Sequence, residues 1–406
     1  MNRDEFAPLK ARLGNLRYLL VAQPPWYQDA QGAVWLDKLW ARDLLRHLDY
    51  ISDLTVLAPM LPLPTPATDG LQRLPDLPGL RFRDLPTGVS ARDGLRKLPA
   101  MLRAAFAAVH GADVVHSGAA GWPIPPGFVV NPLAVMMRRP LVIVVESAFW
   151  RGDGTPRGRG ARLMGGATER LARWSVRRAR LSVFTHQGYA DDLAGGARGQ
   201  VMVSPASWID EADILPLPAA EAAWDAKPPA PRFLLAARLI TAKGIPLALQ
   251  AMELAEAKGH PVALDIIGEG PLAPEIEALA ARLRVARLRL LAPVSYGAPF
   301  FDLLRGYSAV LVPSVSDEQP RILYDAFAQA VPVIASDTPG HREAVIPEVT
   351  GLRFSPNDPA AMLAVLSGTH PDKLRTMGLT ARDRVQAHTH RAMHLARAKA
   401  LAETLA

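Results

Sequence analysis

The sequence predicts an α/β protein with parallel sheets, because short apolar runs alternate with amphipathic helical segments along all 406 residues. The helical pattern is clear in Val34–Leu48. Predicted strands of the first half are Leu16–Ala22, Leu54–Pro59, Ala112–Ser117, Pro140–Glu146 and Leu181–Thr185. Those of the second half are Arg232–Arg238, Val262–Gly268, Arg287–Pro293, Ser308–Ser314 and Val331–Ser336. We therefore expect one parallel sheet in each half of the chain.

Length and composition predict two domains. The chain is 49% hydrophobic, which is enough for two packed cores of ordinary size. Residues 215–231 are rich in Pro and Ala and lack strand periodicity. We expect them to link a first domain, 1–214, to a second domain, 232–385.

Targeting signals are missing from the sequence. It contains no cysteine, so it forms no disulfide and no thiolate metal site, which suits a reducing cytoplasm. The first residues lack the apolar core of a signal peptide. No apolar run reaches the roughly 20 residues that span a bilayer. We expect a cytoplasmic protein, either soluble or peripheral at the inner membrane face.

Positive charge is concentrated in the first half of the chain. Residues 1–200 hold 26 Lys and Arg against 17 Asp and Glu, a balance of +9, and residues 201–406 hold 20 against 22, a balance of −2. The densest basic segment is Arg151–Arg180. It is either a solvated arginine-rich surface or a face that contacts an anionic membrane or acceptor. No nucleic-acid-binding signature accompanies it, so we expect no nucleic acid partner.

The segment Ser316–Val345, SDEQPRILYDAFAQAVPVIASDTPGHREAV, carries the strongest functional signal. It follows a predicted strand, and helical spacing of its apolar residues begins near Arg321 and Ile322. Free N–H groups at that helix start would suit a phosphate. Asp325 lies about one turn into the helix, and its carboxylate can accept hydrogen bonds from paired sugar hydroxyls.

A second loop with a phosphate-binding pattern follows the first strand of the second half. It carries Arg238 and Lys243 and leads through Gly244 into a helix. The arginine side chain can form two parallel hydrogen bonds to phosphate oxygens, and the lysine adds a compact charge. Together these two residues could neutralise a diphosphate without a metal.

At these residues the chain resembles the family 4 retaining glycosyltransferases, whose hallmark is two glutamates eight positions apart followed by a run like AFAQAVPVIAS. In that register Asp317 and Asp325 take the places of the two glutamates. Glu318 lies beside Asp317, and Gln319 and Pro320 stand where the family has glycines. The resemblance implies the GT-B fold, two facing Rossmann-like domains with an interdomain cleft. It also implies that residues 386–406 form a helix that returns to the first domain.

The resemblance further implies a metal-independent enzyme without a cofactor. Such an enzyme moves a sugar from a nucleoside diphosphate sugar to a glycan, lipid-linked or small-molecule acceptor, with retention at the anomeric carbon. Arg238 and Lys243 would contact the diphosphate, together with the helix start at Arg321 and Ile322. Asp325 would bind the nucleotide. The donor sugar would be held by Asp317 or Glu318, and the sequence leaves both open.

Glycines mark three further positions at which the family binds its donor. Gly268 and Gly270 end a strand near the nucleotide base, although a Gly-x-Gly pattern is also typical of a plain tight turn. Gly340 lies in a turn that would allow close approach of the backbone to a sugar or phosphate. Gly32 follows the first strand and is expected to open a helix.

The first domain offers three more candidate residues. Glu146 ends a strand where many relatives carry a histidine that faces the donor sugar, and its alternative role is an ion pair with Arg151. Trp26 and Tyr27 could stack on a sugar or pack in the core.

Other catalytic patterns are missing from the sequence: it has no nucleophile elbow, no phosphate-binding Walker loop and no pair of metal-ligand motifs. Two alternatives to a glycosyltransferase remain. One is another GT-B enzyme such as a sugar-nucleotide epimerase, which needs no acceptor. The other is a non-catalytic protein that binds a nucleotide sugar.

Overall fold

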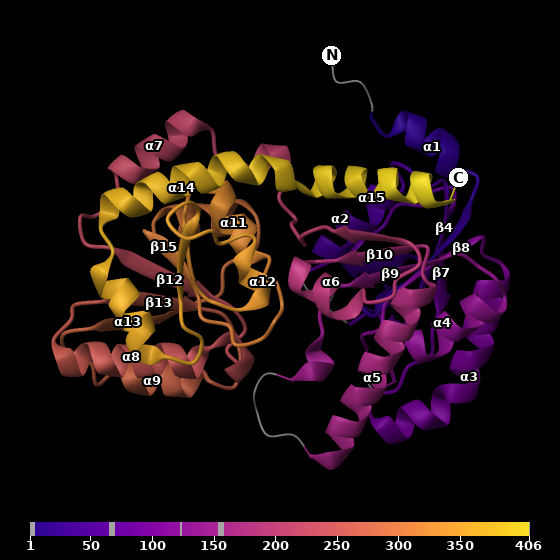
Figure 1. Ribbon diagram of the computed structural model, residues 1–406, viewed down its shortest axis with the longest axis horizontal. Coiled ribbons are helices and arrows are strands. Elements are labelled where there is room, and N and C mark those ends of the chain that lie inside the picture. Colours follow the sequence, from indigo (N-terminus) through magenta and orange to yellow (C-terminus); the bar gives the residue numbers. More distant parts are fainter. Residues whose placement is uncertain (1–4, 65–69, 122–123, 153–157, 406) are drawn as a thin grey trace. The chain divides into compact units, whose positions relative to one another are not determined.

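The computed structural model describes residues 5–64, 70–121, 124–152 and 158–405, which fold into two compact α/β units (Figure 1). The first unit comprises Met1–Arg151, Arg157–Ser204 and Arg391–Ala406. The second is built mainly from Pro205–His390. The last helix of the chain is therefore part of the first unit.

The first unit contains a seven-stranded sheet in which all paired strands are parallel. In spatial order its strands are β11 (Gln200–Val203), β10 (Leu181–Phe184), β9 (Leu141–Val145), β8 (Val114–Ser117), β1 (Arg17–Val21), β4 (Asp53–Ala58) and β7 (Leu80–Asp84). The five predicted strands are confirmed. The two that the sequence did not predict, β7 and β11, are the sheet edges, and their side chains are half-buried or exposed.

Helices cover both faces of this sheet. Along β1, Leu19 belongs to one apolar cluster while Tyr18 and Leu20 belong to another, as alternation along a strand requires. The first cluster includes side chains of α3 (Ala91–His110), α4 (Gly127–Met136), α5 (Arg159–Arg178) and α6 (Gln187–Leu193). The second includes side chains of α1 (Ala7–Leu13), α2 (Lys38–His47) and α15 (His390–Leu405).

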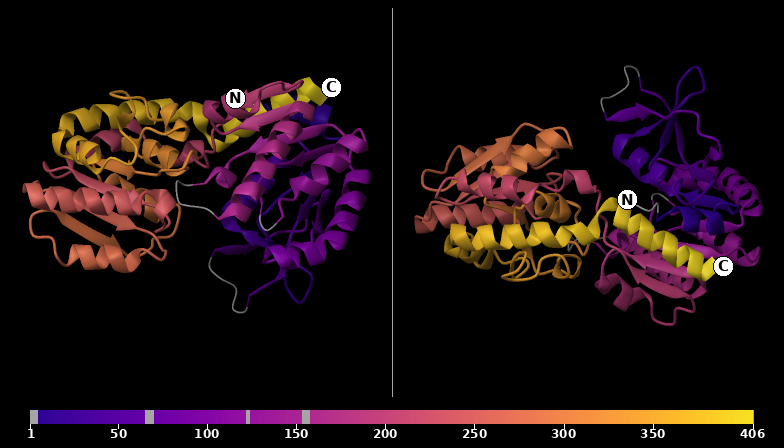
Figure 2. Two further views of the ribbon diagram at one scale, coloured as in Figure 1. Left: turned by 60° about the horizontal axis from the view of Figure 1, so that its bottom comes forward. Right: turned by 90° about the horizontal axis from the view of Figure 1, so that it is seen from above.

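The region that was expected to open a helix at Gly32 forms a small sheet instead. Its strands, in spatial order, are β5 (Met60–Pro62), β2 (Trp26–Gln28), β3 (Val34–Asp37) and β6 (Leu71–Arg73). Gly32 has a φ of +83° in the β2–β3 turn and donates its N–H to the Asp29 carbonyl at 3.0 Å. Helix α2 starts only at Lys38, because the Asp37 carboxylate caps the N–H groups of Leu39 and Trp40. Figure 2 shows this small sheet, in indigo and violet, projecting from the first unit.

The second unit contains a six-stranded parallel sheet. In spatial order its strands are β14 (Arg287–Leu291), β13 (Ala263–Ile267), β12 (Arg232–Ala236), β15 (Ala309–Val312), β16 (Val333–Ser336) and β17 (Gly351–Phe354). Only the edge strand β17 was not predicted. The helices between these strands are α8 (Ile245–Lys258), α9 (Ala273–Ala280), α10 (Ala298–Arg305), α11 (Ile322–Ala328) and α12 (Pro339–Arg342), and α13 (Pro359–Gly368) and α14 (Pro371–Val385) follow the last strand.

The segment expected as a linker, 215–231, contains helix α7 (Leu217–Asp225) and packs on the second unit. The Trp224 indole is buried and donates to the Ala330 carbonyl at 2.9 Å. Lys227 lies 3.3 Å above the Trp224 ring and donates to the Tyr307 carbonyl at 2.7 Å. Pro and Ala in this segment start and form a helix, and Trp224 fixes that helix to the core.

Membrane-spanning helices are not found: within the described ranges, no helix combines the length and the apolar composition that crossing a bilayer requires.

Candidate functional site

Three loops of the second unit meet at the carboxyl ends of β12, β15 and β16, which are neighbours in its sheet. Lys243 lies in the short helix η3 (Thr241–Lys243) after β12, and Glu318 lies in the loop after β15. The Lys243 ammonium and the Glu318 carboxylate are 3.0 Å apart, with 15% and 28% of their side chains exposed. The structure thus brings two predicted site residues, 75 positions apart, into direct contact.

Two glycines allow these loops to approach closely. Gly244 has a φ of +75°, and a Cβ there would lie 1.9 Å from the Pro313 carbonyl oxygen, so a larger residue would push the Lys243 loop away from β15. Gly340 lies at the start of α12, after β16. A Cβ on Gly340 would lie 2.4 Å from the carbonyl oxygens of both Asp317 and Glu318. Both contacts place backbone against backbone, so a side chain at either position would push these loops apart.

Asp325 is buried in α11 with 4% of its surface exposed. Its carboxylate accepts a hydrogen bond from the Tyr296 hydroxyl at 2.9 Å. Sequence reasoning missed Tyr296, because it lies in the loop before α10, where no motif marks it. Arg321 precedes α11, and its guanidinium stacks 3.9 Å from the centre of the Trp208 ring. Ile322 is the first residue of the helix, as predicted from its apolar spacing.

The turn with Gly268 and Gly270 lies against the loop that carries Arg238. The Leu239 N–H donates to the Glu269 carbonyl at 2.8 Å, and the Leu239 carbonyl accepts from the Leu272 N–H. Arg238 itself is exposed, one residue before this contact. These two hydrogen bonds therefore hold the turn against the Arg238 loop.

His341 follows Gly340 and is fully buried. Its Nδ1 lies 2.7 Å from the Ser336 carbonyl oxygen, which can only accept, so Nδ1 carries the proton. Burial lowers the pKa of His341 to about 4, and the ring is neutral at physiological pH. Among the described residues, Nε2 has no hydrogen-bond partner. This loop thus holds a neutral and fully buried nitrogen beside Gly340.

The candidate residues of the first unit are placed as follows. Glu146 comes directly after β9, is exposed and interacts electrostatically with Arg397. Arg151, the alternative partner of Glu146, pairs with Glu169 at 3.0 Å and Asp192 at 2.6 Å.

Both aromatic residues and Gly32 lie in the small sheet or its turn. Trp26 is buried and donates its indole N–H to the Ala58 carbonyl at 3.1 Å, which agrees with the core-packing alternative, while Tyr27 stays partly exposed. Gly32 lines a cavity of about 390 Å³ together with Val34, Leu74, Phe82 and the segment 75–78. The prediction that Gly32 opens a helix is wrong, because Gly32 lies in the turn between the antiparallel strands β2 and β3.

Comparison with known proteins finds a family match within the second unit. No curated protein sequence matches the chain. Residues 230–369 match the family model described as glycosyl transferases group 1. This segment, which makes up most of the second unit, is thus similar to group 1 glycosyltransferases. It contains Arg238, Lys243, Asp317, Glu318 and Asp325, and also the glycines 268, 270 and 340.

Solved structures share the architecture of the whole chain. Sucrose-phosphate synthase from Thermosynechococcus elongatus matches with a TM-score of 0.66 and 18% identity, over 94% of this chain and 97% of that one. WaaG, a glycosyltransferase involved in lipopolysaccharide biosynthesis, matches at 0.64 and 13%, over 94% and 98%. HepE from Anabaena, in complex with UDP and glucose, matches at 0.62 and 15%, over 96% and 99%. These similarities, with the two parallel-sheet units, confirm the predicted GT-B fold.

Proposed function

We propose that this protein transfers a sugar from a nucleoside diphosphate sugar to an acceptor, with retention of anomeric configuration and without a metal ion. The observation that carries the proposal is the meeting of Lys243, Glu318 and the loop of Gly340 at adjacent strand ends of the glycosyltransferase domain. Ligands of open α/β sheets bind at this position. The solved structures of HepE with UDP and with UDP-glucose support a nucleotide sugar as donor.

Lys243 and Arg238 take the diphosphate in this proposal. Lys243 is mostly buried, and Glu318 already compensates its charge. When a phosphate binds, Lys243 therefore exchanges one anionic partner for another. Arg238 is exposed on the same loop and can turn to the outer phosphate oxygens. We propose that the backbone N–H groups at Arg321 and Ile322 also contact the diphosphate.

Nucleotide and sugar are held by different carboxylates. Asp325 accepts from the ribose hydroxyls, and Tyr296 fixes the orientation of its carboxylate. Asp317 binds the donor sugar, because Glu318 already serves Lys243.

Catalysis would rest on charge stabilisation. As the bond between sugar and diphosphate breaks, negative charge grows on the diphosphate, and preorganised cations lower the barrier most when they are aimed at such developing charge. The leaving diphosphate accepts the acceptor's proton on the same face, so the configuration is retained. Glu146 of the first unit would stabilise the positive charge that develops on the sugar.

Product analysis with a panel of nucleotide sugars tests the proposal. Purified protein should convert one donor only when an acceptor is present, retain full activity after chelation with EDTA, and give a product whose anomeric configuration by NMR equals that of the donor. Donor turnover without any acceptor would favour an epimerase or hydrolase instead. Tight binding without turnover across donors and acceptors would favour a non-catalytic binder.

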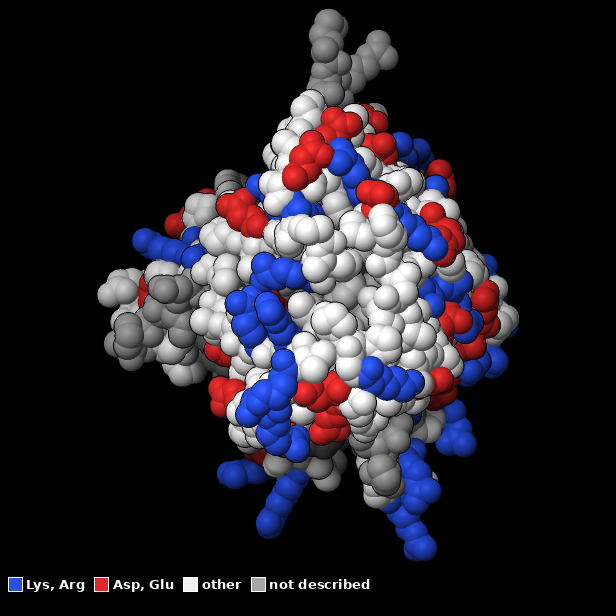
Figure 3. All heavy atoms as spheres, turned by 90° about the vertical axis from the view of Figure 1, so that its left-hand side faces the viewer, with Lys and Arg blue, Asp and Glu red and all other residues white. Residues whose placement is uncertain are grey.

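The acceptor side is proposed to lie near an anionic membrane at its cytoplasmic face. On α5, Leu163 and Met164 are 75% and 45% exposed, beside the exposed Arg159 and Arg162. Exposed apolar side chains flanked by arginines are typical of helices that bind an anionic lipid surface. By contrast, the face in Figure 3 intersperses basic and acidic side chains.

Vesicle sedimentation tests this contact. Wild type should bind vesicles that contain anionic lipid and release them at high salt, and Leu163→Ser should bind several-fold more weakly. Leu217→Ser, which removes a 41% exposed leucine of the second unit, serves as the control and should bind as wild type. Equal binding to neutral vesicles would contradict the electrostatic part of the proposal.

A further inference from the structure

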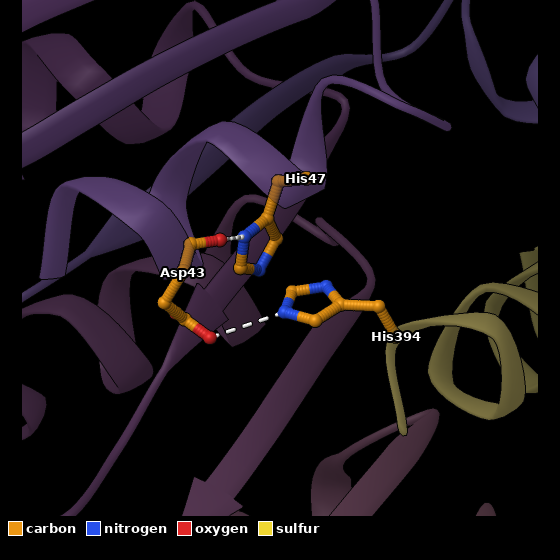
Figure 4. A group of neighbouring side chains, drawn as sticks. All are labelled: Asp43, His47 and His394. Carbon is orange, nitrogen blue, oxygen red and sulfur yellow. Dashed lines mark hydrogen bonds and ion pairs between the residues drawn. The ribbon is translucent and has the colours of Figure 1, made fainter. Parts of the chain in front are cut away.

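Two histidines and an aspartate meet inside the first unit, outside the segment that matches the glycosyltransferase model (Figure 4). Asp43 and His47 are one turn apart on α2, and His394 comes from α15. We propose that Asp43, His47 and His394 bind a divalent transition-metal ion, with Zn²⁺ as the best-suited candidate. No metal site was expected from the sequence, so this proposal departs from that prediction.

The ring of His47 is oriented for metal binding. Its Nδ1 lies 3.0 Å from the backbone carbonyl oxygen of Asp43. A carbonyl oxygen only accepts, so Nδ1 carries the proton and Nε2 carries the lone pair. Metal-binding histidines commonly donate their second nitrogen to a carbonyl in this way, which fixes both tautomer and ring orientation. In Figure 4 the rings of His47 and His394 lie next to each other.

Both ring nitrogens of His394 make hydrogen bonds that can adapt when a metal binds. Nε2 lies 3.1 Å from the Asp43 carboxylate and Nδ1 lies 3.2 Å from the Tyr50 hydroxyl. Without a metal, Nε2–H donates to Asp43 and Nδ1 accepts from Tyr50. When a metal binds at Nε2, the proton moves to Nδ1 and is donated to the Tyr50 oxygen, because a hydroxyl both donates and accepts. The ring thus stays neutral when the metal binds.

Distances between the ligand atoms are close to those of a tetrahedral site. The three ligand atoms lie within 4.8 Å of one another, and the pair from Asp43 and His394 is already at 3.1 Å. Bonds of about 2.0–2.2 Å to zinc place tetrahedral ligand atoms roughly 3.3–3.5 Å apart. A small side-chain adjustment, on the order of 1 Å, therefore closes the site. Two imidazoles and a carboxylate are ligands that zinc prefers.

The two histidines are more deeply buried than Asp43. The side chain of His394 is 1% exposed and that of Asp43 is 26% exposed, while His47 is 1% exposed as a residue. The histidines are thus shielded from solvent, and the side of Asp43 stays open for a water as fourth ligand. Arg397 lies nearby and interacts electrostatically with Asp43, so the site carries a competing positive charge. We expect an affinity below that of four-ligand structural zinc sites for this reason.

A bound metal would tie together parts of the first unit that are 351 residues apart in sequence. Helix α15 would then be held to α2 by coordination bonds in addition to its apolar contacts. A ligand that binds only the folded state stabilises it by mass action. The site is therefore a structural one, separate from any chemistry at Lys243.

Metal titration of the full-length protein tests the proposal. After stripping with a chelator, wild type should bind one Co²⁺ per chain with the visible absorption of tetrahedral cobalt, and Zn²⁺ should displace it and raise the melting temperature. His394→Ala and Asp43→Asn should each weaken binding at least 10-fold. His370→Ala, which removes an exposed histidine 3.4 Å from the Asp372 carboxylate, should bind as wild type.

Two results would overturn the proposal: no stoichiometric Co²⁺ or Zn²⁺ binding by wild type, or unchanged binding in both ligand variants. Should those variants fail to fold, X-ray absorption at the zinc edge of the wild-type protein still decides. A first shell of nitrogen and oxygen with two imidazoles supports the site, and a shell without imidazole contradicts it.

Discussion

The ammonium of Lys243 and the carboxylate of Glu318 form an ion pair of 3.0 Å at the ends of two adjacent strands. The sequence suggested both residues for the donor site, but with separate partners. Their contact means that the cation proposed for the diphosphate is already neutralised before a ligand arrives. Donor binding must therefore replace or share this partner, and the variants below follow from that relationship.

Removal of either cation should abolish most transfer. We expect Lys243→Ala and Arg238→Ala each to lower the transfer rate by roughly 10²–10³, the usual loss when one preorganised donor to a developing negative charge is removed. The measurement is the steady-state rate with the best donor. Arg238 is exposed, so its variant should melt within a degree or two of wild type. Near-normal rates in both variants would remove the diphosphate assignment.

Asp317 and Glu318 should give opposite results. Asp317→Ala should impair transfer and leave the affinity for free nucleoside diphosphate unchanged, because the lost contact is to the sugar. Glu318→Gln removes the anion that competes for Lys243, so nucleoside diphosphate should bind more tightly, by on the order of 1 kcal/mol. Calorimetry measures the affinity of both variants for nucleoside diphosphate, and steady-state assays measure their transfer rates. If Glu318→Gln shows the larger loss of transfer, Glu318 holds the sugar instead.

Asp325→Ala should reduce nucleotide affinity by about 1.5–3 kcal/mol, the cost of losing hydrogen bonds to a charged acceptor. Asp325→Asn should lose less. Tyr296→Phe is the matched variant, because it removes the 2.9 Å hydrogen bond but keeps the carboxylate, and we expect an intermediate loss. Titration with free nucleoside diphosphate checks the order, and unchanged affinity in Asp325→Ala would place the ribose elsewhere.

Gly340→Ala should destabilise the second unit by roughly 1–3 kcal/mol, since its Cβ would meet two carbonyl oxygens at 2.4 Å. Gly166→Ala provides the control. Gly166 lies within α5 with nothing within 4 Å of a Cβ, so alanine there should stabilise the helix by about 0.5–1 kcal/mol. Thermal unfolding measures both. Equal melting temperatures for the two variants would contradict the close approach.

Stability of the second unit should fall in acid partly because of His341. Its pKa is about 4 when folded and 6.5 when unfolded, so the unfolded chain binds the proton more readily between these values. The stability is complete above pH 6.5 and decreases by on the order of 3 kcal/mol as the pH falls to about 4. His341→Gln should show a smaller decrease over this range. Urea unfolding at several pH values compares the two proteins, and parallel pH profiles would contradict the assignment.

All interior strands of the two large sheets could be predicted from the sequence, but of their four edge strands only β14 could. Runs such as Leu141–Val145 are buried on both faces and read as continuous apolar segments. The edge strands β7, β11 and β17 have half-buried or exposed positions and lack that signal. Helix α2 was predicted to start too early, because Val34–Asp37 fits the spacing of a helix as well as that of a strand. Only the cap at Asp37 separates the two elements.

The candidate site was predictable where a local motif marks it. Lys243, Glu318 and Asp325 each lie in a loop or helix whose pattern is visible in the sequence, but their contacts are not local. Tyr296 reaches Asp325 from another loop, and no sequence pattern predicts this contact. His394 is a still clearer case, because its partner Asp43 lies 351 positions away. Such pairs follow only from the way in which the elements pack.

Helix α15 has a consequence for how this protein is made. Its residues Leu395, Ala398 and Leu401 belong to the apolar core of the first unit, whose strands come from the beginning of the chain. During synthesis, those strands leave the ribosome long before α15 does. The apolar face that α15 covers therefore stays exposed until then. The second unit, by contrast, has nearly all its parts by residue 390. We expect the second unit to have its complete core available by about residue 390, before the first unit can complete its own.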